Sequence, residues 1–193
     1  MIFKNTHQEA SRRRRAKLVG LTACAVLALP AGTSLASDGG IGTDGDRNTV
    51  PGAKAKLVNG KAIAPQSAPA KVQRAIAAAN DIVKGKGYCL GGGHRRWKSS
   101  CYDCSGTVSY ALGKFGARVL DAPLPSGSFG SWGKRGKGQW ITVYWDSGHM
   151  FAVIAGLRLD TSQTAGAGPG WSKDVRAGFA NVSKRSARHW RGL

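Results

Sequence analysis

Apolar residues recur at helical spacing in two parts of the chain, and the first lies within residues 70–84. Four of them occupy positions i, i+4, i+7 and i+11, namely Val72, Ile76, Ala79 and Val83. This spacing puts the four side chains on one face of a helix, and the neighbouring alanines allow close packing. We predict a scaffold helix here, capped by Ser67 and ended by the glycines at positions 85 and 87.

The second helical pattern begins at a cysteine. Positions i, i+3, i+4 and i+7 are apolar, namely Val108, Ala111, Leu112 and Phe115. Asp103 or Ser105 can cap the start of this helix, and Gly116 can end it. Cys104 then lies in the first turn, near unpaired backbone N–H groups and the positive end of the helix dipole. That setting favours the thiolate, which is the nucleophilic form of cysteine.

The alternation typical of β-strands follows further along the chain, in residues 139–145, 149–155 and 157–161. If Ala155 and Gly156 form a two-residue turn, Asp160 lies directly opposite Phe151. His149 is then the diagonal neighbour of Asp160 on the same face of the sheet. Diagonal neighbours lie roughly 7–8 Å apart at the backbone, which an imidazole and a carboxylate can bridge.

The rest of the chain carries weaker structural signals. Asn59-Gly60 between short apolar runs predicts a β-hairpin with a type I′ turn. The glycines at positions 91–93 allow close approach of another chain segment or a ligand. Residues 117–138, residues 162–174 and the basic tail are rich in loop-forming or polar residues, and we predict no element in them.

The amino-terminal segment has the pattern of an export signal. A basic stretch ending at Lys17 precedes the apolar run of residues 18–29, and Ser34-Leu35-Ala36 offers a cleavage site. The apolar run is too short to span a bilayer. We predict a signal peptide over residues 1–36, a disordered leader over 37–56 and one folded domain over 57–193. The mature protein is then secreted, extracellular or cell-wall associated, with no transmembrane segment.

The chain is strongly basic, with 29 Lys and Arg against 10 Asp and Glu. Without residues 1–36, which hold six basic and one acidic residue, the net charge is +14. Such a charge attracts polyanions. For an exported protein, anionic cell-wall polymers are a better match than nucleic acid, and we expect a monomer.

Three cysteines remain after residue 36, namely Cys89, Cys101 and Cys104. An odd number outside the cytoplasm means one disulfide and a free thiol, or no disulfide. A Cys89–Cys101 bridge would leave Cys104 free, although spacing does not prove this pairing. In the alternative interpretation, these cysteines and His94 have the spacing C-x4-H-x6-C-x2-C and hold Zn²⁺ in a basic binding module.

Cys104, His149 and Asp160 together suggest thiol catalysis. A cysteine nucleophile needs an imidazole that accepts its proton, and it benefits from a third group that orients the ring. The pattern assigns these roles to Cys104, His149 and Asp160 respectively. The predicted chemistry needs no metal and no cofactor.

The same residues resemble a known family. The core of the pattern is Asp103-Cys104-Ser105-Gly106. It is preceded by Tyr88-x-x-Gly91-Gly92 and followed by Gly148-His149, with the histidine 45 residues after Cys104. This combination is similar to the NlpC family (NlpC/p-sixty) of cell-wall cysteine peptidases. The likeness runs from about Val58 to the carboxyl terminus, and it looks closest to secreted actinobacterial members.

The resemblance implies an α+β, papain-like fold in which the nucleophile helix packs on an antiparallel sheet. It also implies hydrolysis of amide bonds in peptidoglycan stem peptides, often next to a D-amino acid. Tyr88, Asp103 and Ser105 match or adjoin family positions that bind substrate. The third catalytic position, usually His or Asn, holds Asp160, where a carboxylate can bind the Nδ1–H of the histidine.

Two departures from the family pattern affect the expected substrate. Cys89 and Leu90 replace the residues usually found before the paired glycines, and the segment 95–101 is unusually basic. Two further functions also stay open. One is a catalytically inactive wall-binding module on the same fold, and the other is a thiol amidase or acyltransferase.

Overall fold

The computed structural model describes residues 48–193, except for residue 147 and the segments 163–167 and 176–185. The predicted signal peptide and residues 37–47 of the predicted leader lie outside the described residues. The described residues all belong to one unit, Asp44–Leu193. Neither of the α-helices among them is long and apolar enough to cross a membrane.

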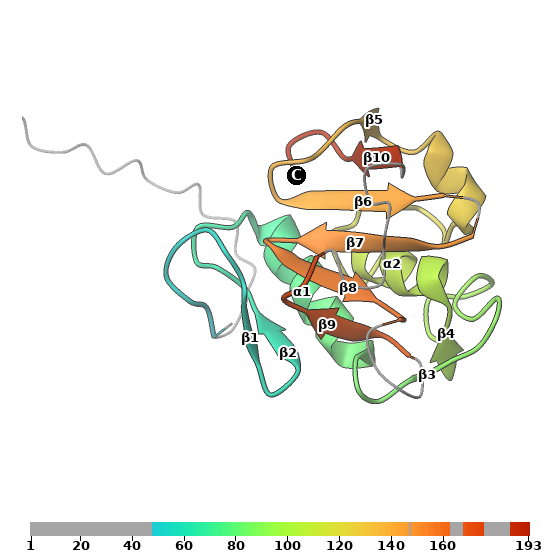
Figure 1. Cartoon of the computed structure of the whole chain (residues 1–193), viewed down its shortest axis with the longest axis horizontal. Helices are drawn as coiled ribbons and strands as arrows, with labels where there is room; N and C mark the ends of the chain where they lie inside the picture. Colours follow the sequence, from blue (N-terminus) through green and yellow to red (C-terminus); the bar gives the residue numbers. More distant parts are fainter. Residues whose placement is uncertain (1–47, 147, 163–167, 176–185) are drawn as a thin grey trace, which may run out of the picture. The chain divides into compact units, whose positions relative to one another are not determined.

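An antiparallel sheet of six strands forms the centre of this unit (Figure 1). Three of its strands follow one another along the chain and pair in sequence, because short turns join them. The order across the sheet is β5 (Lys134–Arg135), β10 (Ser186–His189), β6 (Ile141–Trp145), β7 (Met150–Ile154), β8 (Leu157–Asp160) and β9 (Gly170–Ser172).

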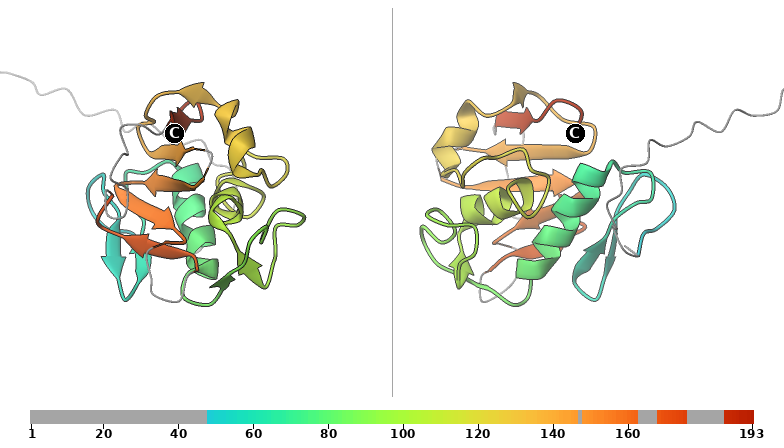
Figure 2. Two further views of the ribbon diagram at one scale, coloured as in Figure 1. Left: turned by 45° about the vertical axis from the view of Figure 1, so that its right-hand side comes forward. Right: turned by 180° about the vertical axis from the view of Figure 1, so that it is seen from behind.

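Two α-helices cover one face of this sheet, α1 (Ala70–Ile82) and α2 (Cys104–Leu112) (Figure 2, right). Both helices turn an apolar face toward the strands, and a single hydrophobic core joins them to the sheet. Burying one such aliphatic side chain stabilises the fold by about 1.5–3 kcal/mol. The predicted α+β class, with helices packed on an antiparallel sheet, is therefore confirmed at this level.

Helix α1 forms where the apolar spacing predicts it, but its ends differ from the prediction. The helix stops at Ile82, two residues before the expected end, and Lys84 then adopts a positive φ of 62°. The prediction that Ser67 caps this helix is wrong. Its hydroxyl donates to the carbonyl of Gly52 instead, and the residue before the helix is Pro69, which offers no side-chain cap.

Helix α2 begins at Cys104, as the spacing predicts, but it ends at Leu112. Phe115 was expected on its buried face and instead lies beyond the helix, 39% exposed, where it stacks on Tyr110. The chain turns at Gly113, which packs so closely against Trp97 that a Cβ there would lie 2.1 Å from the indole ring. Gly113 also has an extended backbone, with φ −86° and ψ −151°, so the helix ends before Gly116 is reached.

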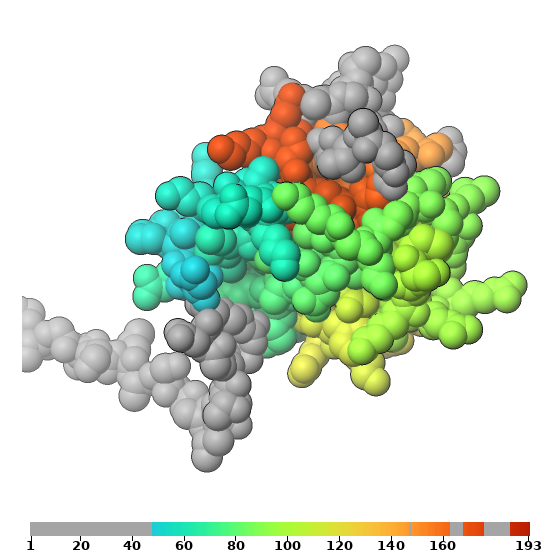
Figure 3. All heavy atoms as spheres, turned by 90° about the horizontal axis from the view of Figure 1, so that it is seen from below, coloured from blue at the N-terminus to red at the C-terminus, as the bar shows by residue number. Residues whose placement is uncertain are grey.

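Two small sheets lie beside the main one. Strands β1 (Lys56–Val58) and β2 (Lys61–Ile63) form the predicted hairpin, and the positive φ values of Asn59 and Gly60, 49° and 77°, fit its type I′ turn. Strands β3 (Gly87–Tyr88) and β4 (Cys101–Tyr102) pair in parallel. In Figure 3 the hairpin region (cyan) lies beside the segment that follows α1 (green).

The prediction of a disordered leader is wrong for its last residues. Val50 exchanges backbone hydrogen bonds with Ala64 and Gln66, and Ala55 donates to the carbonyl of Ala155. These bonds fix residues 50–56 to the domain although the segment lacks apolar periodicity. Pairing with the backbone of residues distant in sequence leaves no periodic pattern to detect.

Several elements arise where no element was predicted. The segment 117–138 contains the 3-10 helix η1 (Ser126–Gly130) and strand β5. Strand β9 lies in the predicted glycine-rich loop, and β10 lies in the basic tail. Each of these short strands extends an existing sheet edge, so tertiary pairing rather than local sequence determines it.

Candidate active site

Cys104 is the first residue of α2, and Asp103 is the residue that caps this helix. The Oδ1 atom of Asp103 accepts a hydrogen bond from the backbone N–H of Gly106 at 2.7 Å. The Cys104 side chain is partly buried and its thiol is free. The capped helix start therefore presents a free thiol at the end of α2, as the sequence predicts.

A glycine-rich loop packs against the first turn of α2. A Cβ atom on Gly106 would lie 2.0 Å from the carbonyl oxygen of Gly92, so only glycine fits at this contact. The same carbonyl accepts a hydrogen bond from the backbone N–H of Asp103 at 3.2 Å. The close approach predicted for the three glycines is thus to the first turn of α2. Through these contacts the loop fixes the position of Cys104.

A disulfide joins Cys89 to Cys101. It ties the start of the glycine loop to the strand that leads into α2. The zinc interpretation is contradicted by this pairing, because two of the four proposed ligands are bonded to each other and cannot bind a metal as thiolates. The disulfide alternative, which leaves Cys104 free, is the one that the structure contains.

His149 lies at the start of β7, held by the turn before it. The Oδ1 atom of Asp146 accepts hydrogen bonds from the backbone N–H groups of Gly148 and His149, both at 2.8 Å. The positive φ values of Ala155 and Gly156, 46° and 86°, close the predicted turn between β7 and β8. The resulting register, with Ala152 opposite Leu159, is the one that brings His149 and Asp160 together.

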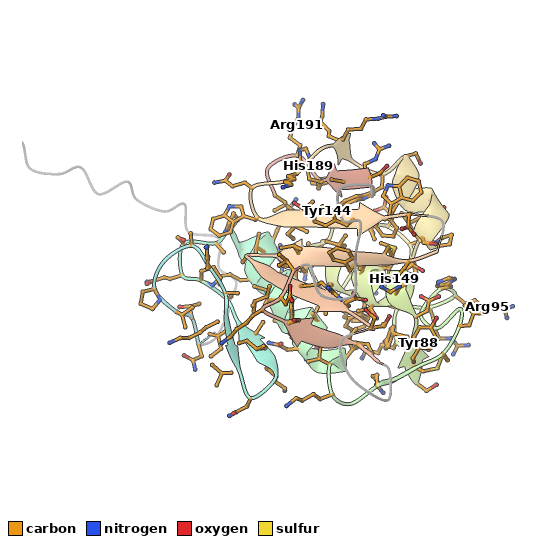
Figure 4. The ribbon with its side chains drawn as sticks, in the orientation of Figure 1. Tyr88, Arg95, Tyr144, His149, His189 and Arg191 are labelled. Carbon is orange, nitrogen blue, oxygen red and sulfur yellow. A yellow bond between two sulfur atoms is a disulfide. The ribbon has the colours of Figure 1, made fainter. Side chains whose placement is uncertain are left out.

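The His149 ring, labelled in Figure 4, contacts both a carboxylate and the Cys104 thiol. Its Nε2 atom lies 2.7 Å from Oδ1 of Asp160, and the ring also hydrogen-bonds the Cys104 side chain. The expectation that the carboxylate binds Nδ1 is therefore wrong, because the ring nitrogen that contacts Asp160 is Nε2. Cys104 of α2, His149 directly before β7 and Asp160 of β8 form a continuous chain of contacts.

The charge state of His149 follows from these contacts. Burial by itself lowers the pKa of the imidazole, because it disfavours the charged form. The hydrogen bonds to Asp160 and Cys104, and the negative charges of both groups, act in the opposite direction. The net effect raises the pKa of His149 from 6.5 to about 9, so the ring is an imidazolium at neutral pH.

Asp160 is one of the most firmly held side chains in the protein. Its Oδ1 atom accepts from the N–H groups of Thr161 and Ser162, and its Oδ2 atom accepts from Nε of Arg158 at 2.9 Å. Arg158 is itself only 1% exposed and lies over the ring of Phe151. Burial raises the pKa of Asp160, but the bond to His149 and the charges of His149 and Arg158 outweigh it and lower the pKa. The carboxylate stays ionised and oriented.

The three expected substrate-binding residues occupy different environments. Tyr88 is 45% exposed. Its partial burial, together with the nearby charges of Cys104 and Asp103, raises its pKa. Asp103 is only 4% exposed and accepts hydrogen bonds from Gly91, Gly106 and Ser105. The Tyr88 side chain is therefore accessible to a ligand, whereas Asp103 and Ser105 are buried and hydrogen-bonded to each other.

Sequence reasoning missed the roles of two other residues at the site. His94, considered only as a metal ligand, places Nε2 2.8 Å from both Asp103 Oδ2 and Ser105 Oγ. Arg158 stands two positions before Asp160 on the same strand, and this i, i+2 spacing puts both side chains on one face. That spacing was a signal available in the sequence.

No protein-family model matches the chain, and the curated proteins contain no significant match to it. The chemistry of the site therefore rests on its geometry. A free thiol at a helix start, an imidazolium and a buried carboxylate are the parts of a nucleophilic acyl-transfer centre.

Proposed function

We propose that the protein is a secreted cysteine endopeptidase that hydrolyses amide bonds in peptidoglycan stem peptides, on a papain-like fold of the NlpC type. The observation that carries this proposal is the contact chain from Cys104 through His149 to Asp160, at the start of a helix packed on an antiparallel sheet. The resemblance of residues 88–106 and 148–149 to the NlpC pattern supports the choice of substrate.

In the first step, the Cys104 thiolate attacks the carbonyl carbon of the scissile amide. The developing oxyanion lies near the backbone N–H groups at the start of α2, with that of Cys104 as the natural donor. The His149 imidazolium then gives its proton to the leaving amine as the C–N bond breaks. The products of this step are a free amine and a thioester on Cys104.

In the second step, water hydrolyses the thioester. His149, now neutral, removes a proton from the water as its oxygen attacks the thioester carbon. The Cys104 thiolate leaves, and the imidazolium is restored. Asp160 does not take a proton in either step; its negative charge supports the imidazolium and fixes the orientation of the ring.

The experiment that tests this proposal is digestion of purified muropeptides by the protein and by its Cys104→Ala variant, followed by chromatography and mass spectrometry. We expect new stem-peptide fragments only with the unchanged protein. Release of an intact stem peptide from muramic acid would instead indicate an amidase, and transfer to an added amine would indicate an acyltransferase. If both proteins bind the wall and release nothing, the inactive binding module replaces the proposal.

A further inference from the structure

A groove of about 670 Å³ lies between η1 and the strands β5, β6 and β10. Its wall combines positive charge, one aromatic ring, hydroxyl groups and exposed backbone at glycines. The lining residues used in the argument are Arg135, Arg188, Trp145, Gly130, Ser131 and Ser186. None of the residues that line this groove is acidic.

The two arginines of the groove stand directly opposite each other. Arg188 of β10 pairs with Arg135 of β5 in the sheet register, so both side chains project from the same face. Like charges at directly opposed positions destabilise a sheet, and the groove wall supplies no carboxylate to offset them. An anionic ligand between the two guanidinium groups would remove this repulsion.

Two N–H donors of the wall also need an acceptor. Within the described part of the chain, a terminal nitrogen of Arg188 donates to the carbonyl of Gly130. Its Nε atom, and Nε1 of Trp145, are buried and have no hydrogen-bond partner among the residues that the structure describes. Buried donors without acceptors are unfavourable. A carboxylate that draws the Arg188 side chain toward the groove would supply an acceptor to the guanidinium.

The groove reaches the same end of the sheet as the candidate active site. Trp145 is the cross-strand partner of Met150, the residue that follows His149. Trp145 and Cys104 also pack against the same hydrophobic core. Figure 1 shows η1 and the ends of β6 and β8 on one side of the molecule, where Figure 4 labels His149. The chain therefore runs from Trp145, on the wall of the groove, through one short turn to His149 of the candidate site.

We propose that this groove is a subsite for a free carboxylate of the substrate, carried by a residue near the scissile amide. The inference rests on the proposed function and adds a specificity to it: the protein distinguishes a stem peptide with a free acid from the same peptide with that acid amidated. Arg135 and Arg188 bind the carboxylate as a charge-assisted pair, and Trp145 supplies the apolar wall beside it.

The test uses two muropeptides that differ only in whether the carboxyl group beside the scissile amide is free or amidated. Affinity is measured by calorimetry with the Cys104→Ala variant, and kcat/KM is measured with the active protein. We expect the free acid to bind, and to be cleaved, about tenfold better or more, as for loss of a hydrogen bond to a charged group. Arg135→Gln should abolish this preference.

Lys134→Gln is the matched control, because Lys134 is exposed and precedes Arg135 on β5 but does not line the groove. This variant should keep the preference for the free acid. Arg188→Gln is a second probe, and its melting temperature shows whether loss of the Gly130 contact alters the fold. The indole N–H resonance of Trp145 should also shift when the free acid binds.

The outcomes separate this inference from the proposed function. If Arg135→Gln loses affinity for the free acid while no peptide is cleaved, the groove is a carboxylate site and the peptidase proposal fails. If both peptides are cleaved equally well and Arg135→Gln matches Lys134→Gln, the peptidase proposal stands and the carboxylate subsite is refuted.

Discussion

The residue that decides the electrostatics of the candidate site is Asp160. It is 1% exposed and ionised, and Arg158, Thr161 and Ser162 fix both of its oxygens. Oδ1 of this fixed carboxylate also contacts Nε2 of His149 at 2.7 Å. The orientation of the ring is therefore set before any substrate arrives, which is the purpose of the third group in a thiol-imidazole pair.

Replacing Asp160 with Asn should weaken this arrangement without changing its shape. The pKa of His149 should fall below about 9, because the neighbouring negative charge is lost. The rate of peptide cleavage at neutral pH should fall about 100-fold. An NMR titration of His149, together with a cleavage assay, measures both effects.

The control for this substitution is Asp121→Asn, at an exposed aspartate outside the candidate site. It should change neither the pKa of His149 nor the rate. An unchanged His149 pKa in folded Asp160→Asn would show that the carboxylate does not support the imidazolium.

The pH dependence of cleavage follows from the raised pKa of His149. The ring must be protonated to give its proton to the leaving amine, and it stays protonated up to a pH of about 9. The value of kcat/KM should therefore fall as the pH rises through about 9. A pH–rate profile with a falling limb near pH 6.5 would contradict this account.

The raised pKa of His149 also makes the free energy of unfolding depend on pH. The folded pKa of His149 lies above its unfolded value of 6.5, so the folded protein binds the proton more tightly. The stabilisation is fully present below pH 6.5 and is lost as the pH rises toward 9. The pKa of Asp160 is lowered, so its contribution has the opposite pH dependence. It stabilises the fold at pH values above the ordinary pKa of 3.8 and is lost as the pH falls below it.

At the scale of elements, the position of the nucleophile depends on contact between α2 and the glycine loop. Gly106→Ala should destabilise the fold by about 1–3 kcal/mol and lower the cleavage rate, because its Cβ would lie 2.0 Å from the Gly92 carbonyl. Thermal unfolding and the muropeptide assay measure the two effects. Gly85→Ala is the control, since nothing lies within 4 Å of its Cβ position. Equal behaviour of the two variants would refute the packing argument.

Elements with local signals could be predicted from the sequence. Each of these signals is contained within a few neighbouring residues. They are the apolar spacing of α1 and α2, the alternation in β6 to β8 and the Asn59-Gly60 turn. The His149–Asp160 contact was predictable for the same reason, because the two-residue turn at Ala155 fixes the register between β7 and β8.

Elements that depend on distant partners could not be predicted. Strand β10 pairs with β5 and β6 across more than one loop, and β9 completes the other edge of the sheet. Their sequences are polar or glycine-rich, so only the exposed sheet edges determine their conformation. The prediction for Phe115 failed because Gly113 adopts an extended backbone and ends α2 early, and apolar spacing does not indicate which glycine ends a helix.

For the whole molecule, positive charge is the dominant property. The net charge is +19 over the full sequence and +14 after residue 36. Such a protein should bind an anionic cell wall mainly through long-range attraction. Salt screens this attraction, because the Debye length shortens from about 10 Å at about 0.1 M salt to about 3 Å at about 1 M. Binding of the Cys104→Ala variant to purified walls should therefore weaken strongly over this range of salt.

A sedimentation assay measures this binding, and walls stripped of their anionic polymers are the control. The stripped walls should bind less protein at low salt and show little dependence on salt. Binding that is equally strong at all salt concentrations would mean that contacts other than charge hold the protein on the wall.

In the proposed mechanism, Cys104 forms a covalent intermediate with the substrate. This step is tested most directly by mixing the protein with a purified muropeptide, quenching with acid within the first turnover, and measuring the intact mass. The account predicts an adduct with the mass of the acyl part of the peptide, attached at Cys104 and absent from Cys104→Ala. Cleavage products that form with no adduct, and that form equally with Cys104→Ala, would contradict it.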